Sequence, residues 1–525
     1  MSITRQGARI GLLMAATAAL LYWASHHAEV AFPDGVRFVR QAERIDRGDL
    51  AAGLWQSIDH PMHPLAIAAA HQVLKGEGPY AWQTAAQAAS VVMLVLAVVP
   101  IYLLGRELFE SDDTAALGCL LVMAGPVATD VAVNVLSETT FLLFWAWGLW
   151  GASRFLRNGR FGWLIPAIGF GALAYLTRPE GLLIHVGLVA TLLALPMLPG
   201  IHILWPRWWA AVGVLVLGPL ALVGPYMAAK GGLATKPAVA RLIGAEPVAP
   251  PEALERERPL PPDQSAWQTY AVAGSRVFRA IRGAVTPPLA PFAALGLVLA
   301  SRKLGRRRAR AWLFVSLVGL IAIAGLVRLH ATGGYCTVRH ALIPGTILTM
   351  AAAHGMIGLM RSVAFDGRWL GLGEGRVRPG PAVWALVIAG VVIIPLYLQM
   401  KPFNSSFAPY RMAGSWIESH AGEGAVLDLT DWSLFFSRQN GAGFPNVLEA
   451  AEDPDTRFLV VRDGQLEGHL HYNEVVRNRV AGRRPVASFP EKTGPRQIRL
   501  SVYDLAGPIP ADVAEGSKDT EARLR

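Results

Sequence analysis

Acidic, basic and histidine residues are scarce in this chain, and several of them stand at the ends of long apolar runs. Asp34 follows the first apolar run, whereas Arg178 and Glu180 separate two later ones. Arg339 and His340 begin another. A carboxylate at the membrane surface can take a proton from a hydroxyl or an amine. Arginines bind phosphate through charge-assisted hydrogen bonds. The two types of residue therefore predict a general base and a phosphate cradle.

Three further candidates lie on the same side of the predicted membrane. The stretch DHPMHP places His60 and His63 three residues apart, and Glu138 opens an apolar run. Two imidazoles in such a turn can face a phosphate or a metal ion. Histidines in this pattern are not a reliable metal signature, so we predict no cofactor. A divalent metal held by Asp34, His60 and His63 is the alternative.

Each of these residues also has a purely structural interpretation. Asp34 suits the N-cap of a helix, and polar loop histidines are usually solvated. Arg178 and Glu180 can pair with each other across a tight helix hairpin. Arg339 and His340 can extend toward the interface without binding anything.

The composition is that of a polytopic membrane protein. Of 525 residues, 53% are hydrophobic and only 16% are charged. The net charge is +10, but the basic residues form short clusters between apolar runs, where membrane topology explains them. Nothing indicates a nucleic-acid partner. The two cysteines make neither a disulfide framework nor a metal knuckle.

Apolar segments long enough to cross a bilayer predict about eleven transmembrane helices. They lie near residues 9–26, 81–104, 114–131, 138–153, 162–177, 181–198, 208–228, 287–300, 311–328, 340–360 and 381–398. The first resembles a signal peptide but has no clear cleavage site, so we interpret it as a retained anchor. Arginine-rich loops predict a cytoplasmic N-terminus and an extracytoplasmic C-terminal domain. We expect the membrane to be the inner membrane of a bacterium.

This topology predicts a membrane domain over residues 1–400, with outer loops at 28–80 and 230–286, and an α/β domain over residues 401–525. The second outer loop is rich in proline and then has the pattern of an amphipathic interfacial helix near 267–281. The tail predicts a helix at 408–420 and strands at 425–430, 457–463 and 496–505. The strand at 457–463 is expected near the centre, and the end after about 510 is expected to be disordered.

These motifs together resemble the GT-C membrane glycosyltransferases. The resemblance rests on an acid soon after the first span, an HP turn, the pair SE that opens a span, the TRPEGLL hairpin and a late arginine at the start of a span. The resemblance is to the dolichyl-phosphate-mannose protein mannosyltransferases (glycosyltransferase family 39) and to the aminoarabinose lipid A transferase type. Two departures stand out: Gly35 follows the acid where the mannosyltransferases have a second acid, and His340 replaces a tyrosine.

The resemblance implies a hexose or pentose donor on a polyprenyl phosphate and a protein, lipid or glycan acceptor on the extracytoplasmic side. It implies that Asp34 is the catalytic base and that Arg178 and Arg339 hold the lipid phosphate. A transporter or flippase of lipid-linked saccharides is the alternative, and a non-catalytic scaffold is a third. Transporters tend to have inverted repeats and polar groups at the midplane, whereas this sequence has no evident repeat and its charges lie at span ends.

Overall fold

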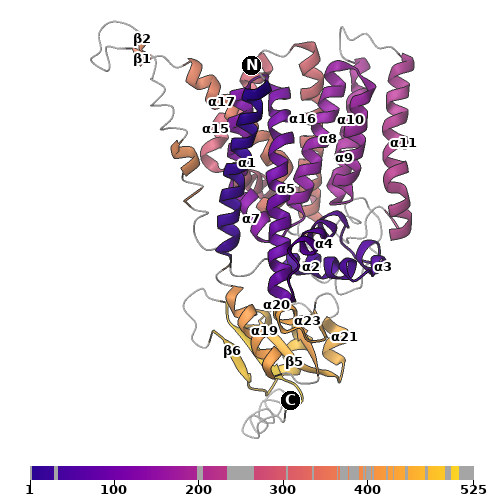
Figure 1. Cartoon of the computed structure of the whole chain (residues 1–525), viewed down its shortest axis with the longest axis vertical. Coiled ribbons are helices and arrows are strands. Elements are labelled where there is room, and N and C mark those ends of the chain that lie inside the picture. Colours follow the sequence, from indigo (N-terminus) through magenta and orange to yellow (C-terminus); the bar gives the residue numbers. More distant parts are fainter. Residues whose placement is uncertain are drawn as a thin grey trace.

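The structure, a computed structural model, consists of a helical bundle, a small α/β unit below it, and short helices between the two (Figure 1). It describes residues 3–28, 33–197, 205–232, 265–302, 305–333, 336–362, 365–366, 376–377, 389–393, 396–397, 404, 407–420, 424–429, 431–443, 447–467, 471–490 and 498–507. The predicted proline-rich part of the second outer loop and the end after 510 lie outside these residues.

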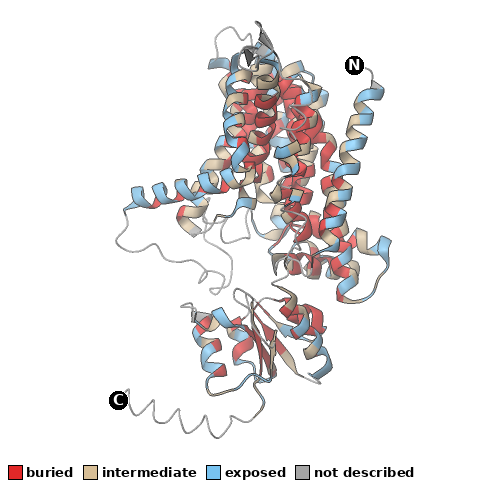
Figure 2. Cartoon of the chain, turned by 90° about the vertical axis from the view of Figure 1, so that its left-hand side faces the viewer, coloured by how far each residue is buried: buried red, intermediate tan, exposed pale blue. Residues whose placement is uncertain are grey.

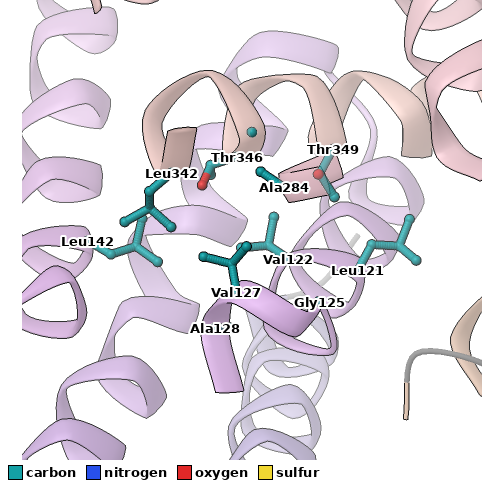
Figure 3. A pocket seen from close by; sticks show the side chains of 11 residues that line it. Leu121, Val122, Gly125, Val127, Ala128, Leu142, Ala284, Leu342, Thr346 and Thr349 are labelled. Carbon is teal, nitrogen blue, oxygen red and sulfur yellow. The ribbon is translucent and has the colours of Figure 1, made fainter. Parts of the chain in front are cut away.

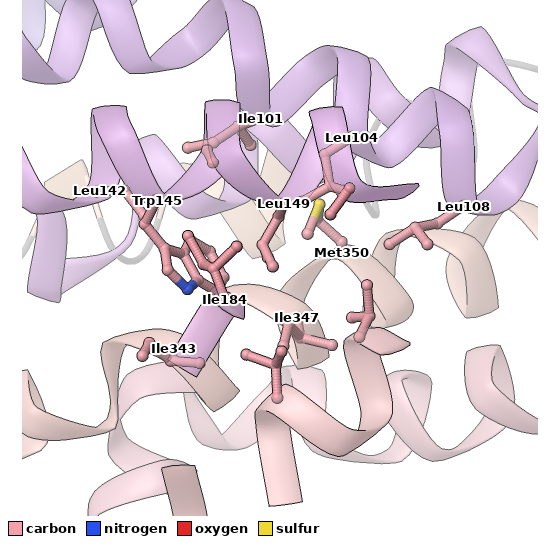
Figure 4. Packing of buried hydrophobic residues seen from close by; sticks show 14 of the residues in the cluster. Ile101, Leu104, Leu108, Leu142, Trp145, Leu149, Ile184, Ile343, Ile347 and Met350 are labelled. Atoms are coloured by element: carbon pink, nitrogen blue, oxygen red, sulfur yellow. The ribbon is translucent and has the colours of Figure 1, made fainter. Parts of the chain in front are cut away.

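The bundle is built from long apolar helices. They are α1 (Ile3–His26), α5 (Gly78–Phe109), α6 (Asp112–Met123), α7 (Pro126–Val133), α8 (Glu138–Asn158), α9 (Leu164–Tyr175), α10 (Leu182–Ala194), α11 (Trp205–Lys230), α14 (Ala266–Val285), α15 (Ala290–Arg302), α16 (Arg306–Gly333) and α17 (Leu342–Ser362). At their centre Trp145 of α8 is fully buried and belongs to one cluster with Ile101 of α5 and Ile347 of α17 (Figure 4). Helices that are distant in sequence therefore share one core.

Helices occupy every predicted span except 381–398, most of which lies outside the described residues. Six of them are long and apolar enough to cross a membrane on their own. The number rises to eight if two bent pairs each count as one span, namely α6 with α7, bent by 47°, and α14 with α15, bent by 89°. The chain is thus a polytopic α-helical membrane protein, but the predicted number of about eleven spans is not confirmed.

One end of the bundle collects the acids of residues 105–113, GRELFESDD, where α5 ends and α6 begins, and arginines from the ends of other helices. Glu107 lies 3.2 Å from Arg154 and 3.1 Å from Arg157. Asp113 likewise pairs with Arg9 at 3.0 Å and with Arg361 at 3.4 Å. The acids that run against the positive-inside pattern in the sequence therefore serve as partners that tie basic helix ends together.

The opposite end of the bundle carries the opening segment, folded as α2 (Pro33–Asp46), α3 (Leu50–Leu54) and α4 (Met62–Leu74). Val36 and Val39 of α2 are buried, whereas Arg40, Arg44 and Arg47 are partly or fully exposed. The helix is amphipathic because apolar residues recur at helical spacing between the arginines. The expected charged outer loop is thus a set of short helices lying on the bundle.

The α/β unit contains a five-stranded sheet in the order β4-β3-β5-β7-β6. Its strands are β3 (Ala425–Asp428), β4 (Gly441–Ala442), β5 (Thr456–Arg462), β6 (Ala487–Phe489) and β7 (Leu500–Asp504), and its helices are α19 (Ala408–His420), α20 (Trp432–Ser437), α21 (Val447–Glu452), α22 (Asp463–Leu466) and α23 (His471–Val480). β3 pairs parallel with β4 and β5, and β7 pairs antiparallel with β5 and β6. The predicted α/β fold and the central position of the strand at 457–463 are confirmed. A separate two-stranded hairpin pairs β1 (Phe365–Asp366) with β2 (Arg376–Val377).

The α/β unit and the opening segment share a continuous apolar core. One cluster joins Val39 of α2 and Trp82 of α5 to Trp432 and Phe436 of α20. Figure 2 shows buried residues both in the bundle and inside the α/β unit. The unit is therefore docked on the membrane domain through packed side chains and not only through the linking chain.

The predicted amphipathic helix of the second outer loop is α14. Ser265 caps it through a capping box with Gln268. Ala273 and Val277 are buried against the bundle, whereas Trp267 and Phe278 are 79% and 66% exposed. A large aromatic surface outside the core is typical of a helix at the membrane interface.

The docking cluster predicts a specific loss of stability for Trp432→Ala. Trp432 is 1% exposed and stacks on Phe436, and truncating a buried tryptophan costs about 3–5 kcal/mol of unfolding free energy. Thermal unfolding of the detergent-solubilised chain should therefore begin at a lower temperature in this variant. Trp267→Ala removes the same group from an exposed site and should leave the midpoint unchanged. Equal midpoints for the two variants would contradict the docked core.

Candidate functional site

Asp34 lies in the first turn of α2 and is held by two arginines. Its Oδ2 accepts a hydrogen bond from Arg339 Nη2 at 2.6 Å, and its Oδ1 accepts one from Arg37 Nη1 at 3.2 Å. The side chain keeps 26% of its exposure. An acid in the first turn is also favoured by the helix dipole. Asp34 is thus fixed in place by charge and still reaches solvent.

Gly35 explains one departure from the mannosyltransferase pattern. A Cβ built at this residue would lie 2.7 Å from the carbonyl oxygen of Asn134, which is too close for any side chain. The start of α2 therefore approaches the chain between α7 and α8 at backbone distance. A second acid after Asp34 has no room here, so the site has a single acid at this position.

Arg178 stands at the turn between α9 and α10 and binds two acids. Its guanidinium lies 2.8 Å from Glu138 Oε1 and 2.8 Å from Glu180 Oε1, and it also donates to Ser137 Oγ at 3.3 Å. Glu138 is 3% exposed and Glu180 is 41% exposed at the side chain. The predicted pairing of Arg178 with Glu180 is present, but the contact with Glu138 also ties the hairpin to the start of α8.

The turn that presents Arg178 depends on a glycine. The 3-10 turn η2 (Pro179–Gly181) packs back on the end of α9, and a Cβ at Gly181 would overlap the backbone of Tyr175. Only glycine permits this close approach. The TRPEG stretch is thus a tight hairpin that holds its arginine toward the neighbouring helix α8.

The two arginine clusters belong to one site. Arg339 and His340 lie on η5 (Val338–Ala341), the turn that opens α17. Glu138 interacts electrostatically with Arg178, Arg339 and His340. Since Arg339 binds Asp34, the structure brings together Asp34, Glu138, Arg178, Glu180, Arg339 and His340 from four separate stretches of the chain. We call this group the charged site.

His60 lies beside the charged site and is almost fully buried, with 3% exposure. Its ring meets Tyr175 edge-on at 5.1 Å and tilts against Tyr226 at 5.9 Å. Asp59 directly precedes His60, and its carbonyl oxygen accepts a hydrogen bond from Lys230, at the end of α11, at 2.8 Å. His60 is thus enclosed by aromatic side chains, contrary to the solvated loop position that its sequence context suggests.

His63 has protein partners at both ring nitrogens. Nδ1 lies 2.9 Å from Thr140 Oγ1, and Nε2 lies 3.3 Å from the carbonyl oxygen of Val135. The residue is fully buried. These contacts fix the start of α4 against the start of α8, so we assign His63 a structural role and leave it out of the proposed site.

The sequence interpretation missed Arg37 and Asp59. Arg37 Nε lies 3.2 Å from Asp59 Oδ2, and Asp59 is 1% exposed. Burial lowers the pKa of Arg37, but the negative charges of Asp59 and then Asp34 raise it by more. The net effect is a raised pKa for this guanidinium. The i,i+3 spacing of Asp34 and Arg37 on one helix was the available signal. The contact with Asp59 has no signal in the sequence.

No metal-binding cluster accompanies the charged site in the part of the chain that the structure describes. No group of three or more His, Cys, Asp or Glu side chains there has the geometry to hold a metal ion. A cavity of about 20 Å³ lies inside the bundle between α6, α7 and α17, lined by Leu121, Val127 and Thr346 among others (Figure 3). It has room for about one water molecule, so it is a packing defect and not a substrate site.

The buried state of His63 predicts a pH dependence of stability. Burial lowers its pKa to about 4, below the ordinary 6.5. As the pH falls below 6.5 the unfolded chain takes up this proton first, so the free energy of unfolding decreases down to pH 4 by about 3 kcal/mol. His63→Gln cannot titrate and should lose less stability than the parent chain over this range. If the free energy of unfolding falls by the same amount in both proteins between pH 7 and pH 4.5, His63 is not buried in its neutral form.

One family model matches part of the chain, and several solved structures have a similar fold. Residues 59–224 match the family model described as dolichyl-phosphate-mannose-protein mannosyltransferase. This region holds His60, Glu138, Arg178 and Glu180, whereas Asp34 and Arg339 lie outside it. No curated protein sequence matches the chain.

Three solved structures of similar fold are membrane glycosyltransferases. The archaeal oligosaccharyltransferase AglB from Archaeoglobus fulgidus, in complex with an inhibitory peptide and a dolichol-phosphate, has a TM-score of 0.58 at 12% identity, covering 97% of this chain and 76% of that one. ArnT from Cupriavidus metallidurans, bound to undecaprenyl phosphate, has a TM-score of 0.55 at 14% identity, and the match covers 95% of this chain and 99% of that one. The arabinofuranosyltransferase AftD from Mycobacteria has a TM-score of 0.50 at 14% identity, and the match covers 95% of this chain and 41% of that one. The predicted resemblance is confirmed: this chain has the GT-C membrane glycosyltransferase fold, and residues 59–224 match the dolichyl-phosphate-mannose-protein mannosyltransferase model.

Proposed function

We propose that the chain is an integral membrane glycosyltransferase that moves a sugar from a polyprenyl-phosphate donor to an acceptor on the extracytoplasmic face. The observation that carries the proposal is the contact of Asp34 with Arg339 beside the pair of Arg178 and Glu138. A carboxylate and two guanidinium groups thereby meet at one end of the bundle. Two of the proteins of similar fold are described with a dolichol-phosphate or undecaprenyl phosphate bound, which supports a donor of this class.

The chemistry assigned to these residues is a single displacement. Asp34 removes the proton from the acceptor hydroxyl or amine, and the acceptor atom attacks the anomeric carbon of the sugar. The bond between that carbon and the phosphate oxygen breaks, and its electrons leave with the lipid phosphate. Arg178 and Arg339 stabilise the charge that builds up on this phosphate. One displacement inverts the anomeric configuration.

The position of Arg339 couples donor binding to the base. Its guanidinium is bound to Asp34 Oδ2 at 2.6 Å. A phosphate that takes over part of this guanidinium competes with the carboxylate and frees an oxygen of Asp34 for the acceptor. Arg37 stays bound at Oδ1 and keeps the carboxylate in position. Donor binding thereby makes one carboxylate oxygen available to the acceptor.

The alternative of a transporter of lipid-linked saccharides finds less support. Transport sites lie near the midplane of the bilayer, whereas the charged site is formed by helix ends next to the opening segment and the α/β unit. His60 lies at the edge of this site, and we propose that it contributes to the acceptor side together with Glu138.

We propose a cytoplasmic N-terminus in the inner membrane of a bacterium, with the charged site and the α/β unit outside. Arg160→Cys and Glu449→Cys test this topology, because both parent residues are exposed. An impermeant maleimide applied to intact cells should label the cysteine at 449 and reach the one at 160 only after permeabilisation. Labelling of both in intact cells would refute the orientation. Cys336→Ser removes the partly exposed native cysteine as background.

Asp34→Asn and Arg339→Ala should fail in different ways. Loss of a general base costs about 10²- to 10⁴-fold in rate, so Asp34→Asn should bind the polyprenyl-phosphate sugar normally and transfer it slowly. Arg339→Ala loses a charge-assisted contact and should bind the donor about 10- to 100-fold more weakly. Donor binding and single-turnover transfer in nanodiscs measure the two effects.

The matched controls are Asp49→Asn and Arg276→Ala. Asp49 caps α3 in the same opening segment, where asparagine serves equally well, and Arg276 is an exposed residue of α14. Both variants should transfer sugar at the parent rate. Undiminished transfer by Asp34→Asn would show that this carboxylate is structural.

A further inference from the structure

A cavity lined by charged residues lies between the opening segment and the α/β unit, away from the charged site. It has a volume of about 580 Å³. Arginines line it from both sides: Arg40 and Arg44 come from α2, Arg47 follows α2 directly, and Arg438 follows α20. Trp82 and Phe435 contribute apolar walls. We call it the arginine cavity.

The arginines of α2 form one row that begins at the charged site. Arg37, Arg40, Arg44 and Arg47 follow each other at intervals of three and four residues, so they lie on one face of the helix. The first of them binds Asp34 at 3.2 Å. At about 1.5 Å of rise per residue, Arg44 lies about 15 Å along the axis from Asp34. An acceptor that reaches both the cavity and the carboxylate must therefore be extended and longer than a single sugar.

The cavity exists only because the two parts of the chain dock. The Arg438 guanidinium lies directly over Gly78 at the start of α5, where any Cβ would overlap its nitrogen. Gly78 also has a φ of +82°, a conformation that other residues rarely adopt. A glycine at this point therefore makes room for an arginine that belongs to the other unit.

Positive charge exceeds negative charge around the cavity. Arg40 pairs with Asp431 at 3.1 Å, whereas the contacts of Arg47 with Glu43 and of Arg438 with Glu418 are both 3.9 Å long. Arg44 and Arg47 are exposed. Charges in a recess with apolar walls act more strongly on a ligand than they do on an open surface.

We propose that the arginine cavity binds an anionic group, a phosphate or a carboxylate, of the acceptor. This inference rests on the proposed glycosyltransferase function and assigns its acceptor to a chemical class. The anion is held by Arg44, Arg47 and Arg438, and the hydroxyl or amine that receives the sugar reaches back along α2 to Asp34. The group can belong to a soluble saccharide or to a lipid headgroup.

The first test is binding of inorganic pyrophosphate to the full chain in phosphatidylcholine nanodiscs. It uses the Arg339→Ala background, so that the donor site contributes little. Replacing Arg44, Arg47 and Arg438 together by glutamine should weaken binding at least about tenfold. Replacement by lysine should retain most of it, because the charge remains. The paired control Arg276→Gln with Arg279→Gln removes exposed arginines from α14 and should bind as the background does.

Equal affinity of the glutamine variant and its background would overturn the proposal, as would an equal loss in the α14 control. A thermal midpoint matching the background shows that the glutamine variant is folded. Adding phosphatidylglycerol to the nanodiscs separates the two sources. Weaker pyrophosphate binding identifies a lipid headgroup, and unchanged binding identifies a soluble anion.

The second test asks whether the anion belongs to the acceptor. In membranes that contain the natural acceptor, pyrophosphate should inhibit release of polyprenyl phosphate from the donor. The glutamine variant on the parent chain should resist this inhibition about tenfold better. If inhibition persists unchanged in the variant, pyrophosphate acts at the donor site and the acceptor assignment is wrong. Failure of the proposed function itself is distinct, because it appears as transfer unaffected by Asp34→Asn.

Discussion

The contact between Asp34 and Arg339 joins residues that lie 305 positions apart. It ties the first helix after α1 to the turn that opens α17, and it closes the bundle around the charged site. A carboxylate and a guanidinium at the edge of a bilayer are costly to leave unpaired, so each stabilises the position of the other. The same two groups are the ones that the proposed transfer reaction needs. Their mutual attraction is therefore the structural link of the site, and a donor phosphate that binds Arg339 competes with it.

Ion pairs gather at both ends of the bundle, and each end uses them differently. At the arginine-rich end, Glu107 and Asp113 are bound by arginines of several other helices. These pairs fasten helix ends to one another. At the other end, Asp34 keeps a quarter of its side chain exposed. Its two arginines come from separate parts of the chain, and we propose that one of them, Arg339, exchanges the carboxylate for the donor phosphate.

The α/β unit extends the charged site away from the membrane. Its α20 packs on α2 and α5 through Trp432 and Phe436, and this contact brings Arg438 over Gly78. The row of arginines on α2 would face open solvent without it. Docking thus turns an exposed basic helix into one wall of a recess. The stability of the interface and the affinity of the arginine cavity are therefore linked through the same packed aromatic residues.

The sequence by itself determined the local structure and the types of residue available for chemistry. Apolar runs of bilayer length predict the helices, because hydrocarbon tolerates only a backbone that bonds to itself. The run at 457–463 between charged ends likewise predicts the central strand β5. Asp34, Arg178 and Arg339 were identified by their unusual place at the ends of such runs. These signals are local in the chain, so a single sequence contains them.

Tertiary structure alone decided which of these residues meet. Arg339, which binds Asp34, and Glu138, which binds Arg178, come from distant parts of the chain, and nothing in the spacing of the sequence encodes those two pairs. Packing also buried His60 and His63, which the proline-rich loop sequence indicated as solvated. The number of spans depended on bends between α6 and α7 and between α14 and α15. Contacts of this kind arise from the shape of the whole core, and no local pattern in the sequence specifies them.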